Sequence, residues 1–234
     1  MAKKPEVLHE DRVVVYEDGH WPLLANLREK ALSLMQKLET LGVQSYVYGS
    51  IARGDISKSS DIDIIVPYAV PSYKIDLAVG KGAERELVQA TPSSVLKGHL
   101  YIDDMTCVTF PLFKMMTREV EFYKWGGQVS LSQLKENVRV LGVDKRLLLI
   151  EPTESGHIER GVIGYEHIIA KQLGVSIDIA HERVRVLTRR DEVGRTGVYL
   201  TQSITDDESF EEVAKSLKDS DPALRRTIER REGK

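Results

Sequence analysis

The sequence has little of several features that mark special classes of protein. Its 234 residues include one cysteine, Cys107, which excludes an internal disulfide framework and a cysteine-rich zinc site. No apolar run approaches the roughly 18 residues that a membrane helix needs, and the first residues contain no apolar core of a secretory signal. The formal net charge is only -3, so total charge gives no indication of nucleic-acid binding. We therefore expect a cytoplasmic protein without membrane contact, and its oligomeric state is left open.

The composition is sufficient for a folded core. Hydrophobic residues make up 41% of the chain and charged residues 29%, which excludes a wholly disordered protein. The clearest boundary candidate is the polar segment 151–156, which contains Pro152 and Gly156. We therefore expect a first domain over residues 1–150, a second over 151–205 and a charged tail over 206–234, helical in two pieces that divide at Asp221-Pro222.

The spacing of apolar residues predicts a mixture of helices and strands. Leucines recur at steps of three and four between Pro22 and Gly42, which indicates one amphipathic helix. Further helices are expected after Pro111 and after Ser130, where a capping-box pattern begins. Strands are predicted over residues 13–16, 45–48, 62–66, 86–89 and 147–150, with a hairpin over 99–110. The expected fold class is α/β (α+β), with a mixed sheet.

Two aspartates alternate with isoleucines in the predicted strand 62–66. The period of two in a strand places Asp61 and Asp63 on one face, whereas Ile62 and Ile64 point to the other. Two like charges on one face are unfavourable without a cation. Carboxylate oxygens suit Mg²⁺, which commonly takes one or two carboxylates together with substrate phosphates. The strand therefore predicts a divalent metal site.

A glycine-serine pair precedes this strand. Gly49 and Ser50 follow the predicted strand 45–48, at a point where a helical turn begins. Glycine permits close backbone approach, and exposed amides together with the Ser50 hydroxyl can hold phosphate oxygens. Arg53 is close enough in sequence to add positive charge. We therefore predict that Gly49, Ser50 and Arg53 bind a nucleotide.

The segments 48–55 and 60–66 together resemble the motif of the DNA polymerase β nucleotidyltransferase superfamily, and most of all its minimal members. That motif is a glycine-serine pair, a short gap, and two aspartates flanking one residue on a strand. The resemblance implies that Asp61 and Asp63 bind two Mg²⁺ ions, with Mn²⁺ as the alternative metal, which also hold a nucleoside triphosphate. An acceptor hydroxyl then attacks the α-phosphorus, and pyrophosphate leaves.

The resemblance also implies a third carboxylate on a neighbouring strand, which holds one metal and helps to activate the hydroxyl. Glu86 is the favoured candidate because it begins an acid-apolar-apolar run before Thr91-Pro92, which is common in the family. Asp76 and Asp104 are the alternatives. The family more often has aspartate at this place, so Glu86 leaves open that the domain binds nucleotides without transferring them.

The second predicted domain resembles a winged helix-turn-helix. Residues 168–176 have the pattern of a first helix and turn, with Gly174 at the turn, and apolar residues from Ile177 to Leu187 give a second helix. Residues 191–200 have the composition of a hairpin wing. The arginines predicted to contact nucleic acid are Arg183, Arg185, Arg189, Arg190 and Arg195.

These features give a first hypothesis and an alternative. The first is a magnesium-dependent nucleotidyltransferase that transfers a nucleoside monophosphate from a nucleoside triphosphate to an acceptor hydroxyl, on or near nucleic acid. The alternative is a DNA-binding regulator whose transferase domain senses a nucleotide and is catalytically weak or inactive. Neither the acceptor nor the preferred nucleotide is fixed by the sequence.

Overall fold

The computed structural model describes residues 4–194 and 197–233, which divide into two compact units. The first unit combines residues 1–30, 47–60 and 120–196, and the second combines residues 31–46, 61–119 and 197–234. Each unit is therefore assembled from segments that are distant in sequence. Within the described residues, no helix is long and apolar enough to cross a membrane.

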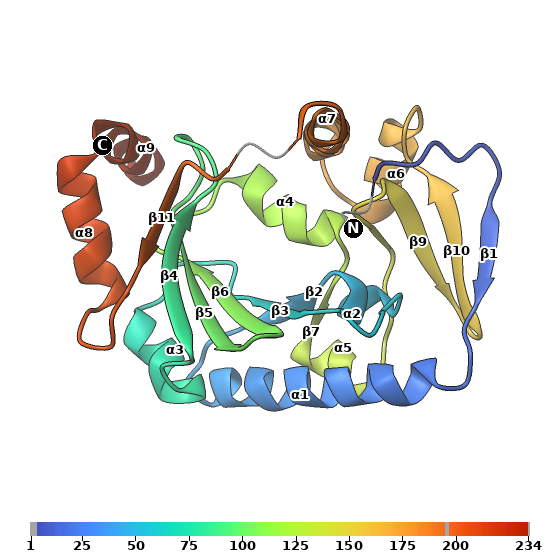
Figure 1. The fold of residues 1–234 in the computed structure, drawn as a ribbon, viewed down its shortest axis with the longest axis horizontal. Helices are drawn as coiled ribbons and strands as arrows, with labels where there is room; N and C mark the ends of the chain where they lie inside the picture. The colour runs from blue at the N-terminus through green and yellow to red at the C-terminus, as the bar shows by residue number, and fades with distance from the viewer. Residues whose placement is uncertain (1–3, 195–196, 234) are drawn as a thin grey trace. The chain divides into compact units, whose positions relative to one another are not determined.

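The first unit contains a four-stranded sheet with the order β1-β10-β9-β8, of which β1, β10 and β9 are labelled in Figure 1. Its pairings are antiparallel. The helices and strands that lie in this unit or begin or end in it are β1 (Arg12–Val15), α1 (His20–Thr40), β2 (Tyr46–Tyr48), α2 (Ser50–Arg53), α4 (Thr117–Trp125), β7 (Gln128–Ser130), α5 (Leu131–Lys135), β8 (Gly142–Val143), β9 (Leu148–Thr153), β10 (Gly156–Gly161), α6 (Glu166–Leu173) and α7 (Ile177–Val193).

The second unit contains strands in the order β11-β4-β5-β6-β3. The β3–β6 pair is parallel and the other pairs are antiparallel, so the mixed sheet predicted from the sequence is confirmed. The elements that lie wholly in this unit are β3 (Ile62–Ile65), α3 (Ser72–Val79), β4 (Glu84–Gln89), β5 (Lys97–Asp103), β6 (Thr106–Pro111), β11 (Leu200–Ser203), α8 (Phe210–Ser220) and α9 (Pro222–Glu232).

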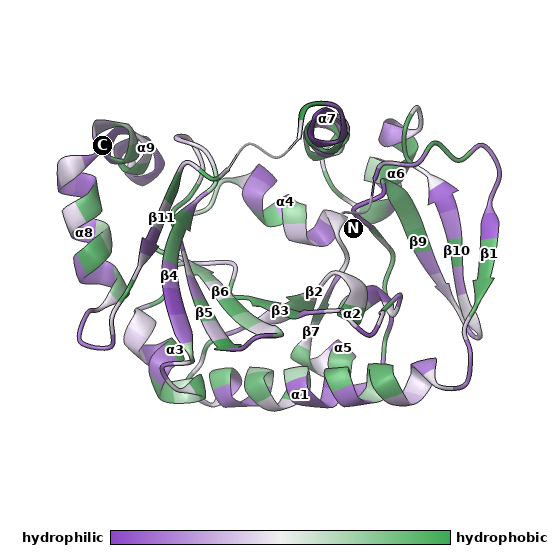
Figure 2. Ribbon diagram, viewed as in Figure 1, coloured by the Kyte–Doolittle hydropathy of each residue, from purple (hydrophilic) through white to green (hydrophobic). Residues whose placement is uncertain are grey.

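Helix α1 confirms the leucine periodicity. Figure 2 shows hydrophobic and hydrophilic residues alternating along it, and Ala31, Leu34 and Leu38 are buried. The helix ends at Thr40, and Gly42 follows with a φ of 70°, a conformation that glycine adopts without strain. The predicted end before Gly42 is therefore confirmed, whereas the helix begins at His20, earlier than the predicted start at Pro22.

The β4-β5-β6-β3 sheet has one apolar face and one polar face. Buried Leu87, Leu100, Val108 and Ile64 lie on the apolar face, where Phe210 of α8 packs against Phe110 of β6 with 4.9 Å between ring centroids. The opposite face carries polar side chains, which include Asp63 and Glu86. This alternation is the expected consequence of the two-residue period of a strand.

The structure does not divide near residue 151. That residue lies inside β9, which pairs with β10 along its whole length. A core cluster also joins Leu147 and Leu149 to Ile169 of α6 and Ile179 of α7. Because α6 and α7 bury their apolar residues against β8 and β9, this helix pair is part of the first unit rather than a separate domain.

The predicted hairpin wing is wrong for the described part of residues 191–200. Helix α7 continues to Val193, and Leu200 begins β11, which pairs antiparallel with β4. The helix-turn-helix pair itself is present, because α6 ends at Gly174 in the left-handed conformation and α7 follows. Residues 195–196, which include Arg195, lie outside the described residues. Among the described residues, no hairpin that could form a wing follows α7.

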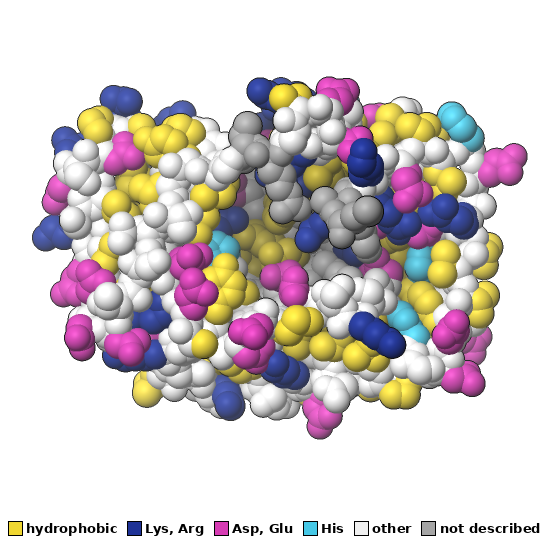
Figure 3. Space-filling model, viewed as in Figure 1, with side chains coloured by type: hydrophobic (Ala, Val, Ile, Leu, Met, Phe, Trp, Pro, Cys, Tyr) yellow, Lys and Arg dark blue, Asp and Glu magenta, His cyan; other side chains and the backbone are white. Residues whose placement is uncertain are grey.

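Three other helix predictions have mixed outcomes. The helix expected after Pro111 begins only at Thr117, because residues up to Pro111 extend β6. The capping box at Ser130 is confirmed, but α5 ends at Lys135. The charged tail forms α8 and α9, which divide at Asp221-Pro222 as predicted. On the face drawn in Figure 3, acidic and basic side chains are interspersed, in keeping with the small net charge.

Candidate active site

The glycine-serine turn lies in the first unit, directly after β2. Gly49 has a φ of 78°, and a Cβ placed on it would meet nothing within 4 Å, so open space adjoins its backbone. Its N–H donates to the Gly127 carbonyl at 2.8 Å. The positive φ explains why glycine is needed here, and the open space can accept a ligand that approaches the backbone closely.

Ser50 begins α2 and is tied to the loop that follows. Its hydroxyl donates to the Ser60 Oγ at 3.3 Å, and the Ser57 N–H donates to the same Ser60 oxygen at 2.9 Å. Ser50 and Ser60 are half-buried. The loop that leads to Asp61 is therefore ordered by hydroxyl groups, which also donate readily to phosphate oxygens.

Arg28 of α1 holds α2 in position through hydrogen bonds to its backbone. This buried side chain of α1 donates to the carbonyls of Ile51 and Ala52, both at 3.1 Å, and to the Val138 carbonyl at 2.8 Å. Burial, together with the charge of Arg139, lowers the pKa of Arg28 to about 10. Sequence analysis missed this residue, because its position within the apolar stripe of α1 gives no indication of a polar role.

Arg53 has a structural role. Its side chain is 6% exposed, and it donates to Asp55 Oδ1 at 2.9 Å and Oδ2 at 3.0 Å in a two-point contact. A third hydrogen bond goes to the Gly126 carbonyl at 2.5 Å. Because these bonds hold the guanidinium inside the fold, the structure does not present Arg53 to a nucleotide as the sequence predicted.

The two aspartates lie in the second unit, at the beginning of β3. Asp61 is exposed and Asp63 half-buried, and the buried Ile62 and Ile64 point to the opposite face of the sheet. The predicted alternation is therefore present. Oxygen donors of this kind suit a hard divalent cation, and one half-buried with one exposed carboxylate leaves room for substrate oxygens.

The neighbouring strand offers a thiol rather than a carboxylate. In the parallel β3–β6 pair, Cys107 is registered with Asp63. Burial raises the pKa of Cys107 to about 12, and the charge of Asp63 acts in the same direction. The side chain nearest to Asp63 on β6 is therefore neutral at physiological pH.

Glu86 lies farther away than the sequence suggested. It is on β4, which is separated from β3 by β5 and β6. In the cross-strand register, Glu86 is paired with His99 of β5, and His99 with Thr109 of β6, rather than with the residue opposite Asp63. At about 4.8 Å between neighbouring strands, the backbones of β4 and β3 are roughly 14 Å apart. Carboxylates that share a Mg²⁺ ion need oxygens about 3 Å apart. The structure therefore does not bring Glu86 to Asp63.

Neither of the two alternative acids, Asp76 and Asp104, is placed to be the third metal-binding carboxylate. Asp76, on α3, pairs with Arg85 at 3.2 Å, and Asp104 lies exposed in the β5–β6 turn. Among the described residues, no group of three or more histidine, cysteine, aspartate or glutamate side chains is placed to hold a metal ion. The residues fit one Mg²⁺ ion that takes Asp61, Asp63 and substrate phosphate oxygens, and they do not supply a third carboxylate.

Further polar residues line the same face as Asp63, and sequence analysis did not assign them to the site. Lys97, His99 and Tyr101 alternate along β5 with buried residues. Burial lowers the pKa of Lys97 to about 8 and that of His99 to about 4, and it raises the pKa of Tyr101 to about 12. His99 Nδ1 lies 3.2 Å from the Thr109 hydroxyl. The alternation of polar residues at 97, 99 and 101 is the signal that could have found this face.

The arginines of α7 differ in their surroundings. Arg183 lies over the Phe122 ring, 4.9 Å from its centroid, and burial lowers its pKa to about 10. Arg185, Arg189 and Arg190 are exposed. Of the predicted nucleic-acid residues, Arg183 is therefore engaged in packing, whereas these three are accessible.

Comparison with known proteins identifies one family. The model of the nucleotidyltransferase domain matches residues 27–183, about two thirds of the chain. The matched range includes both halves of the motif and extends through α6 into α7. No curated protein and no solved structure matches the chain.

Proposed function

The chain belongs to the nucleotidyltransferase domain family, and from this premise we propose that it transfers a nucleoside monophosphate from a nucleoside triphosphate to an acceptor hydroxyl. The acceptor oxygen forms a bond to the α-phosphorus, the bond from that phosphorus to the pyrophosphate oxygen breaks, and the hydroxyl proton is released. The observation that carries the proposal is the position of Asp61 directly before β3 and of Asp63 within it, alternating with the buried Ile62 and Ile64, inside the matched range.

The residues of the motif have separate roles in this proposal. Asp61 and Asp63 hold Mg²⁺, which neutralises charge on the triphosphate and on the leaving pyrophosphate. Within the first unit, the Ser50 hydroxyl donates to a phosphate oxygen, and the open space at Gly49 admits a phosphate group close to the backbone. Arg28 acts as a positioning residue, because its three hydrogen bonds fix α2.

Label incorporation tests this proposal. The full-length protein is incubated with Mg²⁺ and labelled nucleoside triphosphates, with RNA, DNA and protein offered in turn as acceptors. We expect incorporation into one acceptor class and its loss in Asp63→Asn. Asp207→Asn, which removes an exposed acid in the segment before α8, is the matched control. No incorporation by the wild type with any acceptor, or full activity of Asp63→Asn, contradicts the proposal.

A second candidate function is favoured by Cys107. Because the position opposite Asp63 carries a neutral thiol, the domain also fits a nucleotide sensor with weak or no transfer activity, which regulates through DNA contact by Arg185, Arg189 and Arg190. Calorimetric titration with each nucleoside triphosphate separates the two candidates. Mg²⁺-dependent binding without incorporation, together with salt-dependent DNA binding, supports the sensor.

A further inference from the structure

Helix α9 is clamped to the second unit by a buried arginine. Arg231, with a side chain 2% exposed, pairs with Glu119 through two hydrogen bonds of 2.7 and 2.8 Å. It also donates to the carbonyls of Ser93 and Lys114, at 2.8 and 3.0 Å. The Thr227 hydroxyl donates to the Pro92 carbonyl at 2.8 Å. These contacts hold α9 in a fixed position against the turn that contains Pro92.

The four arginines of α9 fall into two pairs. Arg231 forms the clamp, and Arg225 donates to two backbone carbonyls near the end of α8. Arg226 and Arg230 are exposed, and neither has a hydrogen bond or ion pair with any other described residue. Two of the four cations are therefore used by the fold, and two are left for another partner.

The Asp221 carboxylate, which interacts electrostatically with Arg226, already accepts hydrogen bonds from other groups. Asp221 caps α9 by accepting hydrogen bonds from the N–H groups of Ala223 and Leu224, at 2.7 and 3.2 Å. It also accepts a hydrogen bond from the Tyr199 hydroxyl at 2.9 Å. Its hydrogen-bonding oxygens are thereby committed to the fold, and the Arg226 guanidinium keeps its donors available.

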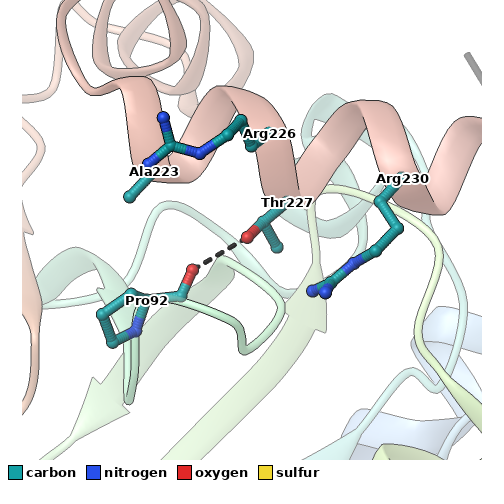
Figure 4. A pocket seen from close by; sticks show the side chains of 5 residues that line it. All are labelled: Pro92, Ala223, Arg226, Thr227 and Arg230. Atoms are coloured by element: carbon teal, nitrogen blue, oxygen red, sulfur yellow. Dashed lines mark hydrogen bonds between the residues drawn. The ribbon is translucent and has the colours of Figure 1, made fainter.

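The two free arginines line a pocket of about 390 Å³. Pro92, Ala223 and Thr227 complete its lining, which contains no carboxylate. Figure 4 shows Arg226 and Arg230 extending from α9 on opposite sides of the hydrogen bond between Thr227 and Pro92. The pocket thus offers two guanidinium groups around an apolar wall that is held rigid by the clamp.

We propose that this pocket binds the phosphate backbone of a single-stranded nucleic acid. Guanidinium groups bind phosphate oxygens at two points, and residues four apart on a helix lie about 6 Å from each other, so two phosphates can be held together. The apolar surface of Pro92 and Ala223 contacts the face of an unpaired base or its ribose, which a duplex does not expose. The proposal rests on the proposed function in one respect. It identifies the acceptor of the nucleoside monophosphate as a single-stranded nucleic acid.

Oligonucleotide binding without catalysis tests the pocket. Anisotropy of a labelled single-stranded RNA or DNA is measured with the full-length protein, without nucleoside triphosphate or Mg²⁺, at several salt concentrations. For Arg226→Ala/Arg230→Ala we expect about tenfold weaker binding at low salt and a salt slope smaller by about 1.4, since each phosphate contact on a single strand contributes about 0.7. The matched control is Lys37→Ala/Lys135→Ala, which removes two exposed cations from α1 and α5.

The outcomes separate the pocket from its rivals. Unchanged affinity of the double arginine variant overturns the proposal, as does a loss confined to Arg185→Ala/Arg189→Ala on α7. Equal binding of a duplex overturns the single-strand assignment. Competition by ATP or inorganic phosphate as effective as that by the oligonucleotide, at equal phosphate concentration, assigns the pocket to free phosphates instead. Since the assay contains no transfer step, failure of the proposed transfer leaves its result unaffected.

Discussion

Cys107 lies directly opposite Asp63 in the parallel pairing of β3 with β6. The pair places a buried thiol of raised pKa beside a carboxylate, at the position on β6 that is registered with Asp63. At this position β6 therefore supplies a neutral thiol and no carboxylate. That side chain can be changed by a single substitution.

Replacing Cys107 with aspartate is expected to create a stronger cation site. In EDTA, Cys107→Asp is expected to lower the free energy of unfolding by about 2–3 kcal/mol, because it buries a second charge beside Asp63. Mg²⁺ is then expected to raise the melting temperature of this variant more than that of the wild type. Cys107→Asn, which is similar in size but uncharged, is the control. Equal Mg²⁺ responses of the two variants would contradict this prediction.

Loss of Arg28 is expected to disturb the glycine-serine turn. Arg28→Met leaves the carbonyls of Ile51, Ala52 and Val138 without their donor, at a cost of about 3 kcal/mol in the free energy of unfolding. Because these bonds fix α2, the KM for the nucleoside triphosphate is expected to rise more than kcat falls. Denaturant unfolding and steady-state kinetics measure the two effects. Lys37→Met, an exposed change on α1, is the control, and equal stability of both variants would count against this role.

His99 is expected to make stability depend on pH. Burial, followed by the charge of Lys97, lowers its pKa from 6.5 to about 4 in the folded chain. Between these values the unfolded chain binds the proton and the folded chain does not, so stability falls as the pH falls from 6.5 towards 4, by roughly 3 kcal/mol. His99→Gln is expected to remove this part of the pH dependence, as measured by denaturant unfolding across the range. His181→Gln, at an exposed position, is the matched control, and parallel curves for wild type and His99→Gln would refute the assignment.

The local features of the candidate site follow from the sequence. The alternation of Asp61 and Asp63 with isoleucines, the glycine-serine turn and the leucine stripe of α1 are short-range patterns, and a strand or helix period fixes which side chains share a face. The expectations for residues 151–205 had a weaker basis. The helix pair α6 and α7 is present, but its apolar residues pack on β8 and β9, and β11 pairs with β4 instead of forming a wing.

The sequence by itself determined that two carboxylates share one face of a strand and that a glycine-serine turn comes shortly before them, because both depend on backbone geometry within a few residues. Only the tertiary structure decided their neighbours. Strand order placed Cys107, and not Glu86, beside Asp63, and burial committed Arg53 to Asp55. Among the described residues, Arg226 and Arg230 of α9 are left without a hydrogen bond or ion pair. Pairings between distant segments depend on which surfaces bury one another in the whole fold, and no local period encodes that choice.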